Sequence, residues 1–270
     1  MMDTAVLKLS TEKVLARKED GIGWLIFNQP EKRNAISIEM WDAIGSALRD
    51  FAEDSAVRVV VMSGAGGKAF AAGADISQFE AVRSDAAAQE EYARRTAIGR
   101  AAMSALDKPL IAMIQGFCIG GGMAIALRAD IRLASSDSQF AIPAAKLGIA
   151  YQHDALHRLV ALTGPAVAKE IMFTGRRFSA GQALAMRLVN TVVEPGALDL
   201  AVRALAAEMV ANAPLSIRSS KASIDQIAGA SVSSDRAALE ALERACFDSA
   251  DYAEGRRAFM EKRKPVFQGR

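Results

Sequence analysis

The sequence predicts an α/β fold, in which buried strands alternate with helices. Two apolar runs of strand length, residues 57–62, broken only by Arg58, and residues 110–115, each lead into a glycine-rich turn. Between residues 40 and 51, apolar side chains recur at spacings of three and four, as on one face of a helix. After Pro195-Gly196 the pattern is helical to the end of the chain. These patterns indicate a mixed core followed by a helical region.

The other elements follow in chain order. Residues 22–27 form the first predicted strand, and the loop 28–34 leads to a helix that starts at Ser37 without a full capping box. The apolar face of that helix carries Met40, Trp41, Ile44, Leu48 and Phe51. Shorter strands are expected at 131–134, 140–142 and 191–193.

Composition and charge exclude several classes of protein. The 270 residues are 51% hydrophobic and 24% charged, which is typical of a globular domain and not of a disordered tail, a collagen or a disulfide scaffold. Lys+Arg 33 against Asp+Glu 31 leaves a formal charge of +2, so no global field favours nucleic acid or a membrane surface as partner. Cys118 and Cys246 lie far apart without a CxxC partner, which predicts a reduced, cytoplasmic setting.

One apolar stretch, residues 110–127, has the length of a membrane span. Gln115 and four glycines interrupt it, so a buried strand, a glycine turn and a buried helix explain it better. The first 20 residues hold no unbroken apolar run long enough for a signal peptide. No membrane partner is therefore expected.

The two glycine turns, residues 63–76 and 115–123, are the strongest candidates for a site. Each follows a buried strand and leads into a predicted helix, whose first N–H groups have no internal partner. Two such turns facing each other would direct two N–H donors at one carbonyl oxygen, which is an oxyanion hole. The alternative is that the glycines only permit tight packing. A P-loop is excluded because Ala69 follows Gly67-Lys68, and no GxGxxG fingerprint follows the first strand.

Five stretches of sequence occur in a characteristic order. They are NQPEKRNA (28–35), KAFAAGADI (68–76), QGFCIGGG (115–122), FTGR (173–176) with Ala180, and FMEKRKPVF (259–267). Together they span nearly the whole chain, and in them the sequence resembles the crotonase family, the enoyl-CoA hydratase/isomerase superfamily. The resemblance implies a crotonase-like spiral of ββα units over residues 1–196 and a helical C-terminal trimerisation region over 197–270.

The resemblance also assigns a ligand and its contacts. It implies an acyl-CoA thioester, no cofactor beyond the CoA moiety, and a homotrimer or homohexamer. It places the oxyanion N–H groups on Ala74 and Gly121. The residues that it implies for holding CoA are Arg33, Ala35, Lys68, Ala72, Ile76, Lys264 and Phe267. For the lysines, a solvated surface charge is the alternative.

Two catalytic carboxylates of the family are absent. The family's hydratases carry one glutamate three residues after the oxyanion glycine and another twenty residues further on, where this sequence has Ala124 and Ala144. A methyl group neither holds a water nor delivers a proton, so efficient hydration by that route is not expected. Ala144 also argues against relatives that isomerise double bonds with the second glutamate alone.

Residues 151–154 are the candidates for replacement chemistry. The family's hydratases carry small residues here, lining the acyl pocket, whereas this chain has Tyr-Gln-His-Asp. Tyr151 and Asp154 are the candidate catalytic residues, because a phenol or a carboxylate could orient a water or take a proton. Alternatively, Asp154 caps a helix that begins near Ala155. No metal is expected, because His153 and His157 have no third ligand.

Two classes of function remain open. The first is a lyase- or isomerase-type enzyme of fatty acid metabolism that acts on an acyl-CoA thioester, with hydrolysis and decarboxylation as further possible reactions. The second is a non-catalytic acyl-CoA-binding or scaffold protein. The direction in which Tyr151 and Asp154 point discriminates between them.

Overall fold

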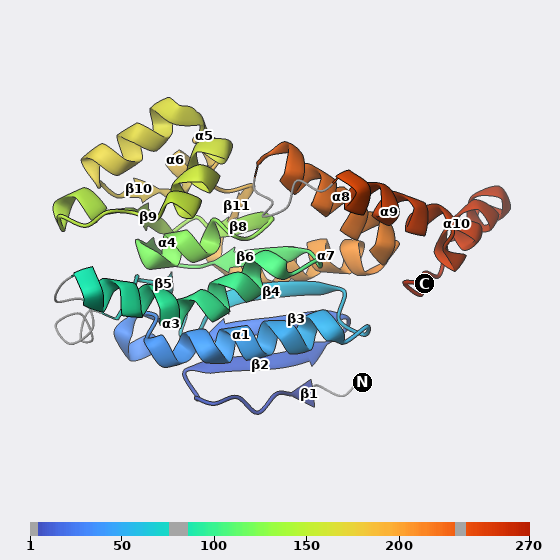
Figure 1. Ribbon diagram of the computed structural model, residues 1–270, viewed down its shortest axis with the longest axis horizontal. Helices are drawn as coiled ribbons and strands as arrows, with labels where there is room; N and C mark the ends of the chain where they lie inside the picture. Colours follow the sequence, from blue (N-terminus) through green and yellow to red (C-terminus); the bar gives the residue numbers. More distant parts are fainter. Residues whose placement is uncertain (1–4, 76–85, 230–235) are drawn as a thin grey trace.

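A computed structural model describes residues 5–75, 86–229 and 236–270 (Figure 1). Its largest unit is a seven-stranded sheet of order β1-β2-β3-β4-β6-β8-β11, in which β1, β2 and β3 are antiparallel and all later neighbours are parallel. The strands are β1 (Ala5–Val6), β2 (Val14–Glu19), β3 (Ile22–Phe27), β4 (Val59–Gly64), β6 (Leu110–Ile114), β8 (Ile131–Ser135) and β11 (Thr191–Val193). The strands expected from the sequence are therefore present, with small shifts at their ends.

A second sheet has four short strands, of which the local sequence pattern predicted only the one at 140–142. Its order is β10-β9-β7-β5, from Phe178–Ser179 (β10), Gln139–Ala141 (β9), Phe117–Ile119 (β7) and Ala69–Ala71 (β5). Two of these strands, β5 and β7, lie inside the stretches expected to be plain glycine turns. They pair in parallel with each other. The glycine before β7 allows the close approach, because a Cβ on Gly116 would lie 2.1 Å from the Lys68 carbonyl oxygen. A Cβ on Gly64 would lie 2.1 Å from the Ala69 carbonyl oxygen, so only glycine fits where β4 turns into β5.

The two sheets confirm the ββα spiral. The pairs β4/β5, β6/β7 and β8/β9 each give one strand to each sheet. The next described helices after these pairs are α3 (Ala86–Ala105), α4 (Gly121–Ala126) and α5 (His153–Thr174). The helix expected directly after the first glycine turn falls on residues 76–85, outside the described part of the chain.

Helices cover both faces of the large sheet. On one face, α1 (Ile38–Glu53) buries the apolar residues that the sequence pattern placed on one side, Trp41 among them. Ser37 is its N-cap, and the Ser37 N–H donates to the Met40 sulfur at 3.4 Å, so a methionine takes the place of the acid or amide of a capping box. On the other face, α7 (Leu198–Val210) packs Leu198 and Val202 onto the sheet.

The chain after β11 is helical, as expected. The 3-10 turn Pro195–Ala197 leads into α7, which is followed by α8 (Pro214–Ile227), α9 (Arg236–Phe247) and α10 (Ala250–Glu261). In Figure 1, α8–α10 extend to one side of the two sheets. Shorter helices complete the fold: Pro30–Lys32, Ala144–Lys146 and α6 (Ala180–Ala185).

Within the described ranges, no single helix is both long and apolar enough to cross a membrane. One pair, Pro195–Val210 and Pro214–Ile227, meets the length and composition requirement only when joined, and it is bent by 106°.

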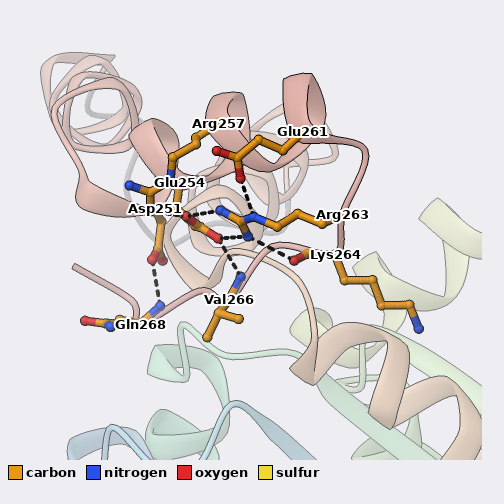
Figure 2. A network of polar contacts seen from close by, with 8 residues as sticks. All are labelled: Asp251, Glu254, Arg257, Glu261, Arg263, Lys264, Val266 and Gln268. Carbon is orange, nitrogen blue, oxygen red and sulfur yellow. Dashed lines mark hydrogen bonds and ion pairs between the residues drawn. The ribbon is translucent and has the colours of Figure 1, made fainter.

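Side-chain acceptors on α10 hold the C-terminal tail (Figure 2). The buried carboxylate of Asp251 accepts the backbone N–H groups of Gln268 and Gly269 at 2.6 and 2.7 Å. Glu254 accepts from Arg263 at 2.6 and 3.0 Å and from the Val266 N–H at 3.1 Å. These bonds fold residues 263–270 back along α10.

Replacing Asp251 with alanine is expected to release this tail. Two part-buried N–H groups lose their acceptor, which costs about 1–3 kcal/mol of local stability. Hydrogen exchange at the Gln268 and Gly269 amides should accelerate, whereas Asp248→Ala, a change at an exposed carboxylate, should leave it unchanged. Equal protection in the Asp251→Ala variant would show that the tail is held by other contacts.

Candidate active site

The two glycine turns meet, as the sequence analysis expected. Because β5 and β7 are neighbours, the segment after β5 lies beside the start of α4. A Cβ built on Gly121 would lie 3.2 Å from the Ala74 backbone nitrogen and 3.3 Å from the Gly73 carbonyl carbon. The backbone amides of Ala74 and Gly121 are thus close neighbours from segments almost fifty residues apart.

Both amides are left without a protein acceptor in the described ranges. Gly121 is the first residue of α4, so its N–H has no partner within the helix. Ala74 forms an isolated parallel bridge with Ile36, but the bonds of that bridge run from Ile36 N–H to Gly73 and from Asp75 N–H to Ile36. The Ala74 N–H takes part in neither, and Ala74 and Gly121 both line the same cavity.

That cavity has a volume of about 390 Å³ and a mainly apolar wall. Its lining comes from α1, α3, α4, the segment after β5 and the segment 142–155. The described lining residues include Trp41, Ile119, Ile125, Ile142, Leu147 and Ile149. An apolar cavity with two unpartnered amides in its wall suits a chain of methylenes that ends in a carbonyl.

Ala124 and Ala144 both line this cavity. Their methyl groups stand where the resemblance led us to look for two glutamates. The described lining contains no carboxylate side chain. At these two positions the described cavity wall therefore presents methyl groups and no carboxylate.

Tyr151 points at the backbone of the same site. Its hydroxyl donates to the Gly120 carbonyl oxygen at 3.1 Å, and the residue lines the cavity. The Gly120 carbonyl and the Gly121 N–H belong to one planar peptide, so this bond helps to fix the plane of the Gly121 donor. Burial raises the pKa of Tyr151 above its usual value, so the phenol stays protonated and acts as a donor.

Asp154 does not line the cavity and is not a helix cap. The N-cap of α5 is Gln152, so the capping expectation was wrong, and Asp154 lies in the first helical turn, where its charge suits the helix dipole. Its carboxylate forms ion pairs with Arg128 and, at 3.5 Å, with Arg158. The segment 151–154 is therefore divided, with Tyr151 and Gln152 at the cavity and Asp154 bound to arginines.

Four of the residues implied for CoA binding belong to segments that contact one another, and one of the four lines the cavity. Ala72 lines it, and the Ala72 N–H donates to the Arg33 carbonyl at 3.0 Å. The Arg33 guanidinium lies 5.0 Å from the centre of the Phe117 ring, and the Phe117 N–H donates to the Lys68 carbonyl at 3.1 Å. The Ala35 N–H donates to the Lys32 carbonyl at 3.1 Å, and Ala35 follows Arg33 by two residues. Ile76 lies outside the described residues.

The two tail residues are not part of this group. Phe267 lines a different cavity, of about 790 Å³, and its carbonyl accepts from Arg58 at 2.7 Å. The Lys264 side chain points away from the polar cluster of the tail (Figure 2). In Figure 1, the end of the chain lies on the opposite side of the molecule from β5. Within one chain, Lys264 and Phe267 therefore lie apart from Arg33 and Lys68.

Sequence reasoning missed three arginines around the cavity. Arg100 and Arg128 line it, and Arg177 lies 5.3 Å from the Phe117 ring, on which Arg33 also packs. Arg128 had a visible signal, because it ends the long apolar run 110–127. Arg100 and Arg177 had none, since only the folded chain brings them to the site.

Comparison with known proteins decides the family. The family model described as enoyl-CoA hydratase/isomerase matches residues 17–270. The chain belongs to the enoyl-CoA hydratase/isomerase family.

Individual members of the family agree with this match. The short-chain-enoyl-CoA hydratase of Clostridium acetobutylicum is 32% identical, over 95% of this chain and 97% of the relative. The carnitinyl-CoA dehydratase of Salmonella typhi is 35% identical, over 88% and 92%. A crystal structure of an enoyl-CoA hydratase/carnitine racemase from Magnetospirillum magneticum superposes with a TM-score of 0.91 at 36% identity, covering 97% of each chain. Both the recognised family and the crotonase fold are therefore confirmed.

Proposed function

We propose that this family member is a lyase- or isomerase-type enzyme that holds an acyl-CoA thioester with its carbonyl oxygen between the Ala74 and Gly121 N–H groups. The supporting observation is the meeting of two unpartnered amides from separate segments in one apolar cavity. The acyl chain occupies the cavity, and Arg33, Ala35, Lys68 and Ala72 hold the CoA moiety at its edge. No cofactor beyond CoA takes part.

The two amides stabilise negative charge on the thioester oxygen. That charge develops when an enolate or a tetrahedral anion forms, and donors fixed in advance lose no energy in reorienting. Removing one such donor typically lowers the rate about 10²–10³-fold. The position of Gly121 at the first turn of α4 adds the favourable potential of a helix N-terminus.

The proton-transfer step differs from that of a two-glutamate hydratase. Ala124 and Ala144 remove that route, and neither candidate from the sequence, Tyr151 or Asp154, replaces it directly. A phenol kept neutral by burial is suited to positioning the Gly120–Gly121 peptide and not to accepting a proton. Asp154 reaches the cavity only through Arg128, so we assign it an indirect role.

Tyr151→Phe tests the positioning role. Without the hydroxyl, the Gly120 carbonyl keeps only its bond from the Ala124 N–H at 3.0 Å, and the Gly121 donor is less well fixed. We expect kcat to fall roughly 3- to 30-fold with little change in KM, in line with one neutral hydrogen bond of about 1 kcal/mol or somewhat more. A tenfold rise in KM at constant kcat would instead assign Tyr151 to ground-state binding.

The position of the tail favours an oligomer. Lys264 and Phe267 lie away from the CoA-binding edge of their own chain, so their proposed contacts to CoA require a second copy. A homotrimer, or two trimers paired into a hexamer, would supply that copy. Sedimentation velocity of the full chain tests this, and a monomer at micromolar concentration would remove both tail residues from the CoA site.

A panel of acyl-CoA esters tests the proposed activity. The wild type should turn over at least one ester, and Asp154→Ala should reduce the rate without abolishing it. If the protein binds CoA esters but turns over none, it is a binding or scaffold protein. The methyl groups of Ala124 and Ala144, where hydratases have glutamates, are the observation that favours this alternative. If it binds none, the thioester site itself is wrong.

A further inference from the structure

The apolar cavity contains a buried guanidinium group that the proposed chemistry does not use. Arg128 follows the end of α4 by two residues, its side chain is 8% exposed, and it lines the cavity. Cations are rarely buried against an apolar wall without a compensating charge. Its role therefore needs a separate explanation.

The partners of Arg128 compensate its charge incompletely. Nη1 donates to the Ser104 hydroxyl at 2.7 Å and Nη2 pairs with Asp154, while Nε has no acceptor in the described chain. Asp154 is half exposed and is shared with Arg158 at 3.5 Å. Two guanidinium groups thus compete for one carboxylate.

The described part of the cavity wall carries a second arginine, Arg100, and no aspartate or glutamate. Burial lowers the pKa of Arg128, Asp154 opposes the effect, and the charges of Arg158 and Arg100 add to it. Among the described residues, Asp154 is thus the one carboxylate that pairs with the Arg128 guanidinium.

α4 separates Arg128 from the proposed position of the thioester oxygen. Gly121 begins α4 and Arg128 follows its last residue, Ala126, by two, so the Arg128 backbone lies beyond the far end of a helix about 9 Å long. An acyl group whose carbonyl rests on Gly121 therefore meets Arg128 at its far end and not at the thioester.

We propose that the cavity selects acyl groups that carry a distal carboxylate, which binds Arg128. This inference rests on the thioester site proposed above and names the class of acyl group that it takes. A guanidinium offers parallel N–H donors to a carboxylate, and the pair gains strength in an apolar surrounding. The same charge disfavours an acyl group that ends in a quaternary ammonium.

Three CoA esters with the same three-methylene spacer test the charge preference by calorimetry on the wild type. They are glutaryl-CoA, ending in a carboxylate; 5-methylhexanoyl-CoA, ending in a neutral isopropyl group; and 4-(trimethylammonio)butyryl-CoA, ending in a cation. We expect glutaryl-CoA to bind roughly 10- to 100-fold more tightly than the neutral ester, and the cationic ester to bind most weakly.

Two variants assign the preference to Arg128. Arg128→Met should abolish the preference while retaining affinity for the neutral ester. Asp154→Asn, which removes the competing carboxylate and keeps the shape, should tighten glutaryl-CoA binding specifically, and it serves as the test if Arg128→Met does not fold. A wild type that prefers the neutral or cationic ester overturns this inference but leaves the thioester site standing. Failure of all three esters to bind refutes the thioester site as well.

Discussion

Gly121→Ala is expected to lose turnover while the protein stays folded. Gly121 does not adopt a left-handed conformation, so its backbone dihedral angles suit alanine. Its methyl group would lie 3.2 Å from the Ala74 nitrogen, in the space proposed for the thioester oxygen. Displacing the oxygen from both donors should lower kcat by about 10²–10³-fold or more. Steady-state kinetics and thermal unfolding of the same preparation measure the two effects separately.

Two other glycines serve as controls for this variant. Gly181→Ala places a methyl group in open space on α6 and should leave both activity and stability near wild type. Gly122→Ala should instead unfold the protein, because its Cβ would lie 2.0 Å from the Ala71 carbonyl oxygen. Full activity of Gly121→Ala would mean that no oxygen sits between the two amides.

The double substitution Ala124→Glu/Ala144→Glu is expected to create crotonyl-CoA hydration. Both residues line the cavity that holds the Ala74 and Gly121 amides, so the new carboxylates would face the acyl chain. Correctly placed acid–base groups typically contribute about 10²–10⁴-fold, and we expect a gain of that order in the hydration rate over wild type. The loss of absorbance of the enoyl thioester follows the reaction.

Matched variants show whether position matters. Each single substitution should give a smaller gain than the pair, because the mechanism needs two carboxylates. Ala150→Glu adds a carboxylate elsewhere on the same cavity wall and should give none. If the folded double variant hydrates crotonyl-CoA no faster than Ala150→Glu, the backbone around Ala124 and Ala144 does not position carboxylates as a hydratase does.

The order of strands and helices was predictable because local patterns determine it. The strand Ile22–Phe27 and the helix face from Met40 to Phe51 carry unbroken apolar patterns of the right period. The short strands β5 and β7 were not predictable, since three residues within a glycine-rich stretch carry no periodic signal. Their formation depends on pairing with each other across the fold.

The site was predictable where it depends on the backbone and not where it depends on side-chain partners. Ala74 and Gly121 were placed by sequence motifs, and the fold brings them together. Asp154 was expected to cap a helix or to enter the pocket, yet Arg128 and Arg158 determine its position. Such ion pairs join residues from different elements, and no local pattern reports them.

The carbonyl stretching frequency of a bound acyl thioester tests the central claim most directly. Isotope-edited infrared spectra of a saturated acyl-CoA labelled with ¹³C at the thioester carbon should show the stretch at lower frequency in the wild type than in water, because two fixed donors polarise the bond. In Gly121→Ala with bound ligand, the frequency should return toward the value in water. An unshifted carbonyl stretch for the ligand bound to the wild type would contradict the proposal that the Ala74 and Gly121 N–H groups donate to the thioester oxygen.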